Sequence, residues 1–458
     1  MTHTSTFSGY HRHKVTRRAW RHAFLAWCLL ASNGFASPRQ TALDWLSRNE
    51  SLLKRAAADL FELAEPAHHE SRTSSYLQAE LRGAGFEIES GVAGLPTSFV
   101  ASFGSGEPTL GIVALLDALP GKDGAWHGCG HNLIGAADLG AALAVKEALA
   151  SHGLPGTIRF YGAPAEEIYH GGVYMVREGL FDDLDAVLFW HPSSVTTVIG
   201  RSGLAMDSVR YVFRGRASDA TDAKDKGRNA LDAAYELASG ARSGWPEGAV
   251  VNHVLLEGGE LPSVVPERAT AWYFLHGRDR AVVDSMRVRM AALARDSAKA
   301  TGTEIEEQLL SSTGSWLINR TLAELLQRNL DDALPLSFSD EPVPISDDTA
   351  EASWVTPRGG FLVQAFAEGS ASHSREWNDT ASSSLARQAV IRAARALASS
   401  ALDLLTDAGL LRAAREEFEI ATAGRSYVSP LPAGRGPFDY LPTISRVLID
   451  STRGGGGS

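Results

Sequence analysis

The sequence has only two cysteines, no basic runs and no basic-aromatic patches. With a net charge of −11, these absences argue against nucleic acid or an anionic membrane surface as the main partner. The 458 residues, 44% hydrophobic and 21% charged, have an ordinary globular composition and suggest two or three domains. A function on small molecules is therefore the better expectation.

The N-terminal region has the features of an export signal. Arg17 and Arg18 precede the apolar run Ala23 to Ala31, and Gly34 and Ala36 fit the −3 and −1 positions of a cleavage site. The run is too short for a stable membrane span. We therefore expect residues 1–36 to be a cleaved signal peptide, with a twin-arginine route open, and the mature protein to be periplasmic or secreted. An uncleaved anchor is the alternative.

Removal of this signal would take Cys28 with it and leave Cys129 without an intramolecular partner in an oxidising compartment. Cys129 lies between His127 and His131 in the stretch WHGCGHN. A free cysteine is usually a small buried hydrophobe, and a Gly-Cys-Gly turn can be a plain tight loop. The rest of the sequence has to decide between that interpretation and a metal ligand.

Helical and strand-like segments alternate along most of the chain. Helical spacing is found at Thr41–Leu63, Thr73–Arg82, Leu133–His152 and Leu385–Asp407. Apolar runs typical of buried strands are found at Leu110–Leu116, Thr157–Tyr161, Asp185–Trp190 and Gly360–Phe366. This order predicts an α/β fold with a mostly parallel central sheet.

The texture changes between Gly203 and about residue 310, where alternating segments and two helices predict an inserted α+β sandwich domain. We therefore expect a catalytic domain in two parts, residues 37–202 and 311–422, around an insert at 203–310. Residues 423–458 are rich in Gly, Pro and Ser and are expected to form a C-terminal extension, ordered to about Tyr440 and loose beyond it.

Polar residues follow the predicted strands at their C-terminal ends, where ligands gather in open α/β sheets. Thiolate, imidazole and carboxylate are the groups that Zn²⁺ or a similar divalent ion binds. The candidate ligands are Cys129, His131, Glu167, His191 and His373. A single ion rarely uses five protein ligands, so two divalent ions with a bridging group fit best. Zinc is the first expectation, with manganese or cobalt as alternatives.

Two adjacent carboxylates, Glu166 and Glu167, cannot both face the same ion comfortably, so one of them is free for proton transfer. A solvated surface pair is the alternative. Asp117 is expected to orient a ligand histidine, and His127 to lie behind the ligands. Three further histidines lack a comparable context and are expected at the surface: His68, His69 and His170.

Five segments resemble the zinc aminoacylase and carboxypeptidase metallopeptidases, in the amidohydrolase branch that includes the p-aminobenzoyl-glutamate hydrolases. The segments are LLDALPG (115–121), WHGCGHNLIGAA (126–137), YGAPAEE (161–167), MVREGLFDDLDAVLFWHP (175–192) and YVSPLP (427–432). The likeness runs from about Thr41 to Pro437. It implies a two-metal catalytic domain interrupted by a smaller lid that also forms the dimer interface. By position it implies the five metal ligands named above, with Glu166 as general base and Asp117 as the orienting aspartate.

Three lid positions depart from the family's pattern. Asp219 stands where the branch has a histidine that crosses the dimer to steady the oxyanion, and its charge would repel developing negative charge. Ser263 replaces an asparagine, and His276 replaces an arginine that commonly grips a substrate carboxylate. The enzyme then either takes amides without the usual free carboxylate or receives the missing histidine from a related subunit in a mixed dimer.

The resemblance implies a metal-dependent hydrolase of amide bonds in N-acyl or aroyl amino acids or small peptides, acting as a homodimer. The alternative is a non-catalytic or partner-dependent subunit of a hetero-oligomeric amidohydrolase, which the changes at Asp219, Ser263 and His276 motivate. A purely structural zinc site is the least favoured interpretation, because such a site does not need the adjacent Glu166.

Overall fold

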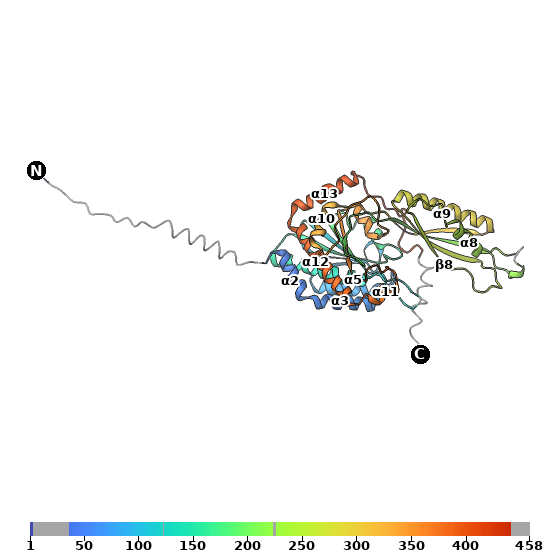
Figure 1. Cartoon of the computed structure of the whole chain (residues 1–458), viewed down its shortest axis with the longest axis horizontal. Coiled ribbons are helices and arrows are strands. Elements are labelled where there is room, and N and C mark those ends of the chain that lie inside the picture. The colour runs from blue at the N-terminus through green and yellow to red at the C-terminus, as the bar shows by residue number, and fades with distance from the viewer. Residues whose placement is uncertain (3–35, 122, 223–225, 441–458) are drawn as a thin grey trace, which may run out of the picture.

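The structure is a computed structural model that describes residues 1–2, 36–121, 123–222 and 226–440 (Figure 1). Nearly all of the predicted signal peptide, and the chain beyond Tyr440, lie outside these residues, so both expectations remain predictions. Among the residues that are described, no helix combines the length and the apolar character needed to cross a membrane.

A seven-stranded sheet forms the centre of the catalytic domain, in the order β1-β2-β4-β3-β5-β11-β6. Its four inner strands are parallel: β4 (Gly156–Ala163), β3 (Thr109–Leu115), β5 (Ala186–Ser193) and β11 (Arg358–Gln364). Antiparallel strands flank them: β1 (Glu87–Ser90), β2 (Phe99–Ser105) and β6 (Thr197–Val198). The predicted α/β fold with a mostly parallel central sheet is confirmed. The sequence pattern missed the flanking strands. Strand β1 is polar and exposed, β6 has two residues, and only the first three residues of β2 are buried.

Helices α5 (His131–His152) and α12 (Ser384–Thr406) pack directly on this sheet, and α2 (Pro38–Arg48) and α3 (Glu50–Leu63) pack outside them. The expected single helix over 41–63 was wrong, because the chain breaks at Asn49 into α2 and α3. Close packing of α3 on α5 requires Gly140, since a Cβ there would lie 2.5 Å from a methyl of Leu53.

The remaining helices of the catalytic domain are short or peripheral: α4 (Ser71–Gly83), α6 (Gly171–Arg177), α10 (Arg320–Asn329), α11 (Arg375–Thr380) and α13 (Ala408–Thr422). Three 3₁₀ helices also occur in the described chain: η1 (Val92–Gly94), η2 (Ala220–Asp222) and η3 (Asp348–Trp354).

The inserted domain, called the lid below, is a four-stranded antiparallel sheet in the order β10-β7-β9-β8. Its strands are β7 (Ala205–Arg214), β8 (Val250–Glu257), β9 (Arg268–Gly277) and β10 (Glu304–Thr313). Helices α8 (Ala230–Gly240) and α9 (Arg280–Thr301) cover one face, and Figure 1 shows them beside β8, away from α2 and α3. The apolar pattern did not show β10, whose first half is acidic, and this strand continues three residues past the expected boundary at 310.

The lid sheet turns its other face toward the catalytic domain. Leu310 and Trp272 of the lid pack with residues of the loop that follows β4, namely Ala165, Ile168 and Tyr169. The alternation of the strands explains the two faces, because Val209, Tyr211 and Tyr273 belong to the core beneath α8 and α9. The loop that carries Glu166 and Glu167 is therefore in contact with the lid.

Candidate metal centre

The stretch WHGCGHN forms a tight turn at the start of α5. Gly130 adopts φ +83°, and a Cβ there would lie 2.8 Å from the Pro192 ring, so both the backbone conformation and the space favour glycine. This turn brings Cys129 and His131 to the same edge of the sheet, where the Cys129 Sγ lies 3.3 Å from Nε2 of His191.

Two histidines have their ring orientation fixed by backbone carbonyls, which can only accept a hydrogen bond. Nδ1 of His131 donates to the carbonyl of Asp117 at 2.8 Å and lies 3.3 Å from its Oδ1. Nδ1 of His191 donates to the carbonyl of Pro192 at 2.7 Å. In the neutral form of both rings, Nε2 is then the unprotonated nitrogen and can serve as a ligand. The expectation that Asp117 orients a histidine agrees with this geometry.

The two adjacent glutamates reach the same place from the loop after β4. Glu167 lies between two histidines, with its Oε1 3.8 Å from Nε2 of His131 and its Oε2 3.4 Å from Nε2 of His373. Its backbone N–H donates to Oδ2 of Asp117 at 3.0 Å. Oε2 of Glu166 lies 3.7 Å from Nε2 of His131. A solvated surface pair is wrong for these two residues, because their side chains are almost fully buried.

His373 joins the group from a loop after β11. Its backbone N–H donates to the carbonyl of Gly128 at 2.8 Å, which ties this loop to the WHGCGHN turn. Its φ of +56° is unusual for a residue with a side chain. The side chain is 53% exposed, so the centre opens to solvent on the side of His373.

Three groups of these side chains have ligand atoms within 4.8 Å of one another: Cys129, His131 and His191; Cys129, Glu167 and His373; and His131, Glu166 and Glu167. Cys129 belongs to two of the groups and could contact two ions. Among the described residues, the buried Nε2 of His131 and Oε1 of Glu167 have no hydrogen-bond partner, which a bound cation would supply. The residues present therefore fit a pair of divalent ions, as the cofactor prediction requires.

The electrostatics of the centre also favour a cation. Burial, and then the nearby carboxylates of Glu167 and Glu166, raise the pKa of the Cys129 thiol well above its usual range. Burial and the adjacent Glu167 likewise raise the pKa of Glu166. A bound divalent ion would reverse this for Cys129, since a coordinating thiol is deprotonated.

Two carboxylates that could not be predicted from the sequence accept hydrogen bonds from the backbone of the loop after β4 and of the start of α6. Oε1 of Glu70 accepts hydrogen bonds from the backbone N–H groups of Ala165 at 2.8 Å and His68 at 2.9 Å. Oδ2 of Asp348 accepts from the N–H of Gly172 at 2.7 Å, at the start of α6. Neither residue belongs to a recognisable motif, because each binds a backbone N–H group that is distant in sequence and close only in the folded protein.

The expected surface position of His170 was wrong. His170 is 3% exposed, and its Nδ1 lies 2.9 Å from Oγ of Ser311 on β10. His68 is partly buried against Tyr169, whereas His69 is exposed. His127 is buried and directs Nε2 toward the carbonyl of Leu60 at 3.1 Å, away from the candidate ligands. The lid strand β10 covers His170, and no pattern in the sequence indicates that packing.

The three departing lid residues do not join this group in the described chain. Asp219 is exposed and accepts hydrogen bonds from the N–H and the hydroxyl of Thr221 at 2.8 and 2.6 Å. The carbonyl of Ser263 accepts from the N–H of Ala220. His276 lies on β9 opposite Met206. Within the described residues, no hydrogen bond or ion pair links any of the three to a candidate ligand.

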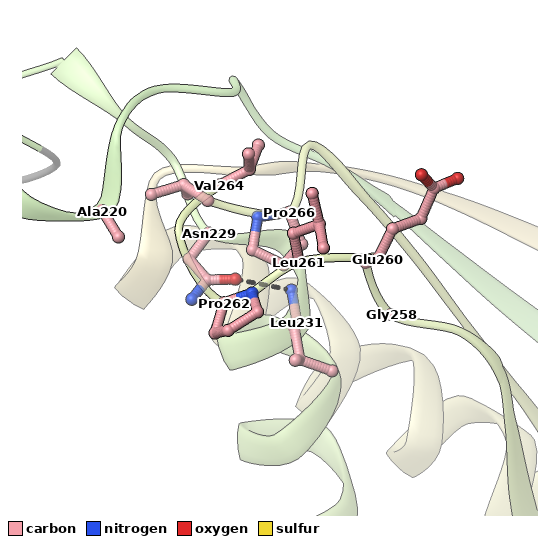
Figure 2. Close-up of a pocket in the computed structure, with 11 residues that line it drawn as sticks. Ala220, Asn229, Leu231, Gly258, Glu260, Leu261, Pro262, Val264 and Pro266 are labelled. Atoms are coloured by element: carbon pink, nitrogen blue, oxygen red, sulfur yellow. Dashed lines mark hydrogen bonds between the residues drawn. The ribbon is translucent and has the colours of Figure 1, made fainter.

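The lid has a hollow of about 440 Å³, and Figure 2 shows residues that line it. Its walls include Ala220, Pro262 and Val264, the sequence neighbours of Asp219 and Ser263. None of its lining residues is a candidate metal ligand. This hollow and the metal centre are therefore separate features of one chain.

Comparisons with known proteins agree with the geometry. The model of peptidase family M20/M25/M40 matches residues 115–402. A p-aminobenzoyl-glutamate hydrolase subunit of Escherichia coli (strain K12) is 28% identical over 457 residues, covering 83% of this chain and 95% of that protein. A Xaa-Arg dipeptidase of Mus musculus is 28% identical over 396 residues, covering 82% and 90%. A dinuclear metal-binding peptidase of family M20 from Bacillus subtilis has a similar fold, with a TM-score of 0.56 and 21% identity over 78% of this chain and 99% of that one.

Proposed function

The chain belongs to peptidase family M20/M25/M40 and is a metal-dependent amidohydrolase, and from this premise we propose that it hydrolyses the amide bond of N-acyl or aroyl amino acids or of small peptides. The observation that carries the proposal is the meeting of Cys129, His131, Glu167, His191 and His373 around a buried Glu166. The family model and the relatives confirm the predicted family resemblance, while the assignment of each residue remains part of this proposal.

Five side chains would hold two divalent ions, zinc first, and Glu166 would act beside them. When bound, such ions polarise a carbonyl and lower the pKa of water. Glu166 accepts the proton of the attacking water and passes it to the leaving amine. Asp117 keeps His131 in the required tautomer and holds the backbone of Glu167.

The test replaces Glu166 by Gln, which keeps the shape and removes the proton acceptor. We expect turnover to fall by about 10²- to 10⁴-fold, the usual contribution of a positioned general base, with metal content nearly unchanged. Glu178→Gln, an exposed glutamate at the end of α6, is the matched control and should keep full activity. Full activity in Glu166→Gln would end this mechanism.

The names of the relatives suggest which compounds to screen first. One relative is a p-aminobenzoyl-glutamate hydrolase subunit and the other a Xaa-Arg dipeptidase. We propose a panel of aroyl-glutamates, N-acyl amino acids and dipeptides with a basic second residue, assayed on the metal-loaded chain alone. Hydrolysis of none of these compounds would contradict the proposed substrate class.

The lid offers an edge through which two chains could associate. Strand β8 is one of the two edge strands of its sheet, and Val250, Val254 and Leu255 on it are 49%, 50% and 42% exposed. Exposed apolar edges favour pairing with another strand. We propose a homodimer formed along β8, and light scattering should show a monomer for Val254→Lys and a dimer for Val288→Lys on α9.

A partner-dependent subunit is the second candidate, motivated by the exposed Asp219 and by the word subunit in the name of the Escherichia coli relative. This candidate predicts that the metal-loaded chain is inactive alone and gains activity when a related chain is added. Activity of the purified chain by itself would rule it out.

Export to the periplasm or the medium is also proposed, from Arg17-Arg18 and the apolar run that follows. N-terminal sequencing of the protein made in its native host should begin at Ser37. A mature chain that still begins at the first residues would contradict it.

A further inference from the structure

Arg210 of β7 is a buried cation without a buried anion. The residue is fully buried, its Nε donates to Oε1 of Gln308 at 2.7 Å, and its Nη2 donates to the carbonyl of Tyr440 at 3.0 Å. Among the described residues Nη1 has no hydrogen-bond partner. The carboxylate of Glu306 pairs instead with Arg214, at 3.1 Å. Burial lowers the pKa of Arg210, as expected for a cation removed from water.

The strand register directs Arg210 toward the catalytic domain. Arg210 lies opposite Trp272 on β9 and Gln308 on β10, so the three residues form a row across the sheet. Val209 and Tyr211, its neighbours in sequence, face α8 and α9. Trp272 packs with the loop after β4, and Arg210 therefore lies at the junction of the lid and the loop that carries Glu166 and Glu167.

The loop after β4 contains a second hydrogen-bond donor without an acceptor among the described residues, the hydroxyl of Tyr169. Tyr169 is two residues beyond Glu167 and is 3% exposed, and its hydroxyl has no hydrogen-bond partner among the described residues. Its ring lies 4.8 Å from the ring of His68, whose two nitrogens also lack partners there. Buried donors are seldom left unpaired, so this junction has unused capacity for an acceptor.

The C-terminal strap, residues 431–440, covers the junction from outside. Its Phe438 ring lies 4.8 Å from the ring of His68, and Arg435 lies 3.7 Å from the ring of Tyr440. Most of the strap is at least partly exposed. The carbonyl of Tyr440 thus gives Arg210 a neutral acceptor in a position where a guanidinium would bind an anionic oxygen more strongly.

We propose that Arg210 and Tyr169 form a carboxylate-binding subsite at the junction of the lid and the catalytic domain. The planar guanidinium can bind both oxygens of a carboxylate, and the phenol hydroxyl can donate to one of them. The acidic group of the substrate enters when the strap moves away from Arg210. This inference rests on the proposed function, because the same substrate presents its amide bond to the metal centre.

A purely structural role is the competing explanation, in which Arg210 only anchors the strap through Tyr440. The two explanations differ in what they predict for pairs of ligands that differ by one charge. A subsite distinguishes a carboxylate from the corresponding carboxamide, whereas an anchor treats both alike.

The experiment uses the full metal-loaded chain and the best acidic substrate of the screen together with its carboxamide. In Tyr169→Phe and in Arg210→Met, KM for the acid should rise at least about tenfold, because each change removes a hydrogen bond to a charged group. KM for the carboxamide and kcat for both compounds should stay nearly unchanged. Arg214→Met, at the exposed end of the same strand, is the matched control and should leave all four constants unchanged.

A binding measurement separates failure of this inference from failure of the proposed function. Calorimetry with glutarate on the Glu166→Gln variant reports the subsite whether or not any compound is hydrolysed, and the double variants Glu166→Gln with Tyr169→Phe or Arg210→Met should bind it at least about tenfold more weakly. Equal acid-to-amide ratios in wild type and Tyr169→Phe, with hydrolysis intact, would overturn the subsite and leave the hydrolase standing. If Arg210→Met fails to fold, Tyr169→Phe alone decides, because it removes only one hydroxyl.

Discussion

The metal centre and the outer part of the lid hold their polar side chains in opposite ways. At the sheet edge, His131 and His191 are each fixed by a backbone carbonyl. In the lid, Asp219 is exposed and bonds only to Thr221, two residues away. The fold therefore holds the side chains of the candidate metal centre in place, whereas Asp219 is held only by its own turn.

The strongest challenge to this comparison is Cys129→Ser. A hydroxyl is a poor substitute for a thiolate that serves two groups of ligands, so at least one metal equivalent should be lost. Activity should fall by more than about 100-fold, since residues that merely support a ligand already contribute about 10- to 100-fold. Elemental analysis and turnover are the measurements, with Val288→Ser, at an exposed position of α9, as the control. A Cys129→Ser protein with its full metal content would show that the centre does not depend on sulfur.

The second test concerns His170, which lies in the loop after β4 and contacts Ser311 of the lid strand β10. Burial lowers the pKa of His170 from 6.5 to about 4, so the unfolded chain binds this proton more readily than the folded one. The free energy of unfolding is therefore unaffected by this group above about pH 6.5 and decreases as the pH falls from 6.5 toward 4. Between pH 7.5 and 5 this group should remove about 2 kcal/mol from the free energy of unfolding.

Urea unfolding at the two pH values measures that loss in wild type and in His170→Asn. Asparagine is chosen because it tolerates the positive φ of this position. The loss should be about 2 kcal/mol smaller in His170→Asn, and unchanged in the exposed control His69→Asn. An identical pH dependence in all three proteins would show that His170 does not link folding to protons.

The smallest effect is expected within the lid. The side chain of Asn229 caps α8 by accepting from the N–H of Leu231 at 3.0 Å (Figure 2). Asn229→Ala should reduce the free energy of unfolding by about 1 kcal/mol, a usual value for a lost N-cap, and leave the metal content unchanged. Glu236→Ala, at an exposed position of the same helix, is the control. Loss of metal from Asn229→Ala would show that the two regions are not separate.

The parts of the fold that could be predicted from sequence are those that apolar runs mark directly. The four parallel strands are buried on both faces, so their runs are continuous, and the polar residue after each run falls at the same edge of the sheet. That is why Asp117, Glu167 and His191 could be grouped from sequence alone. Cys129 and His131 could be added to this group because their turn follows β3, the first of these strands in the chain.

The rest depends on contacts between distant segments. Glu70 accepts a hydrogen bond from the backbone N–H of Ala165, and Asp348 accepts one from that of Gly172. Because every residue except proline has a backbone N–H, the sequence cannot indicate such contacts. The burial of His170 depends on a lid strand that comes 141 positions later. Asn49 divides one amphipathic pattern into two helices without disturbing its spacing.

The contact of His373 with Gly128 has a consequence for biosynthesis. The turn with Cys129 is translated early, but its partner histidine leaves the ribosome only after the whole lid has been made. A nascent chain thus holds an incomplete set of donors for most of its synthesis. A centre that uses His373 can therefore be completed only after the lid has been synthesised.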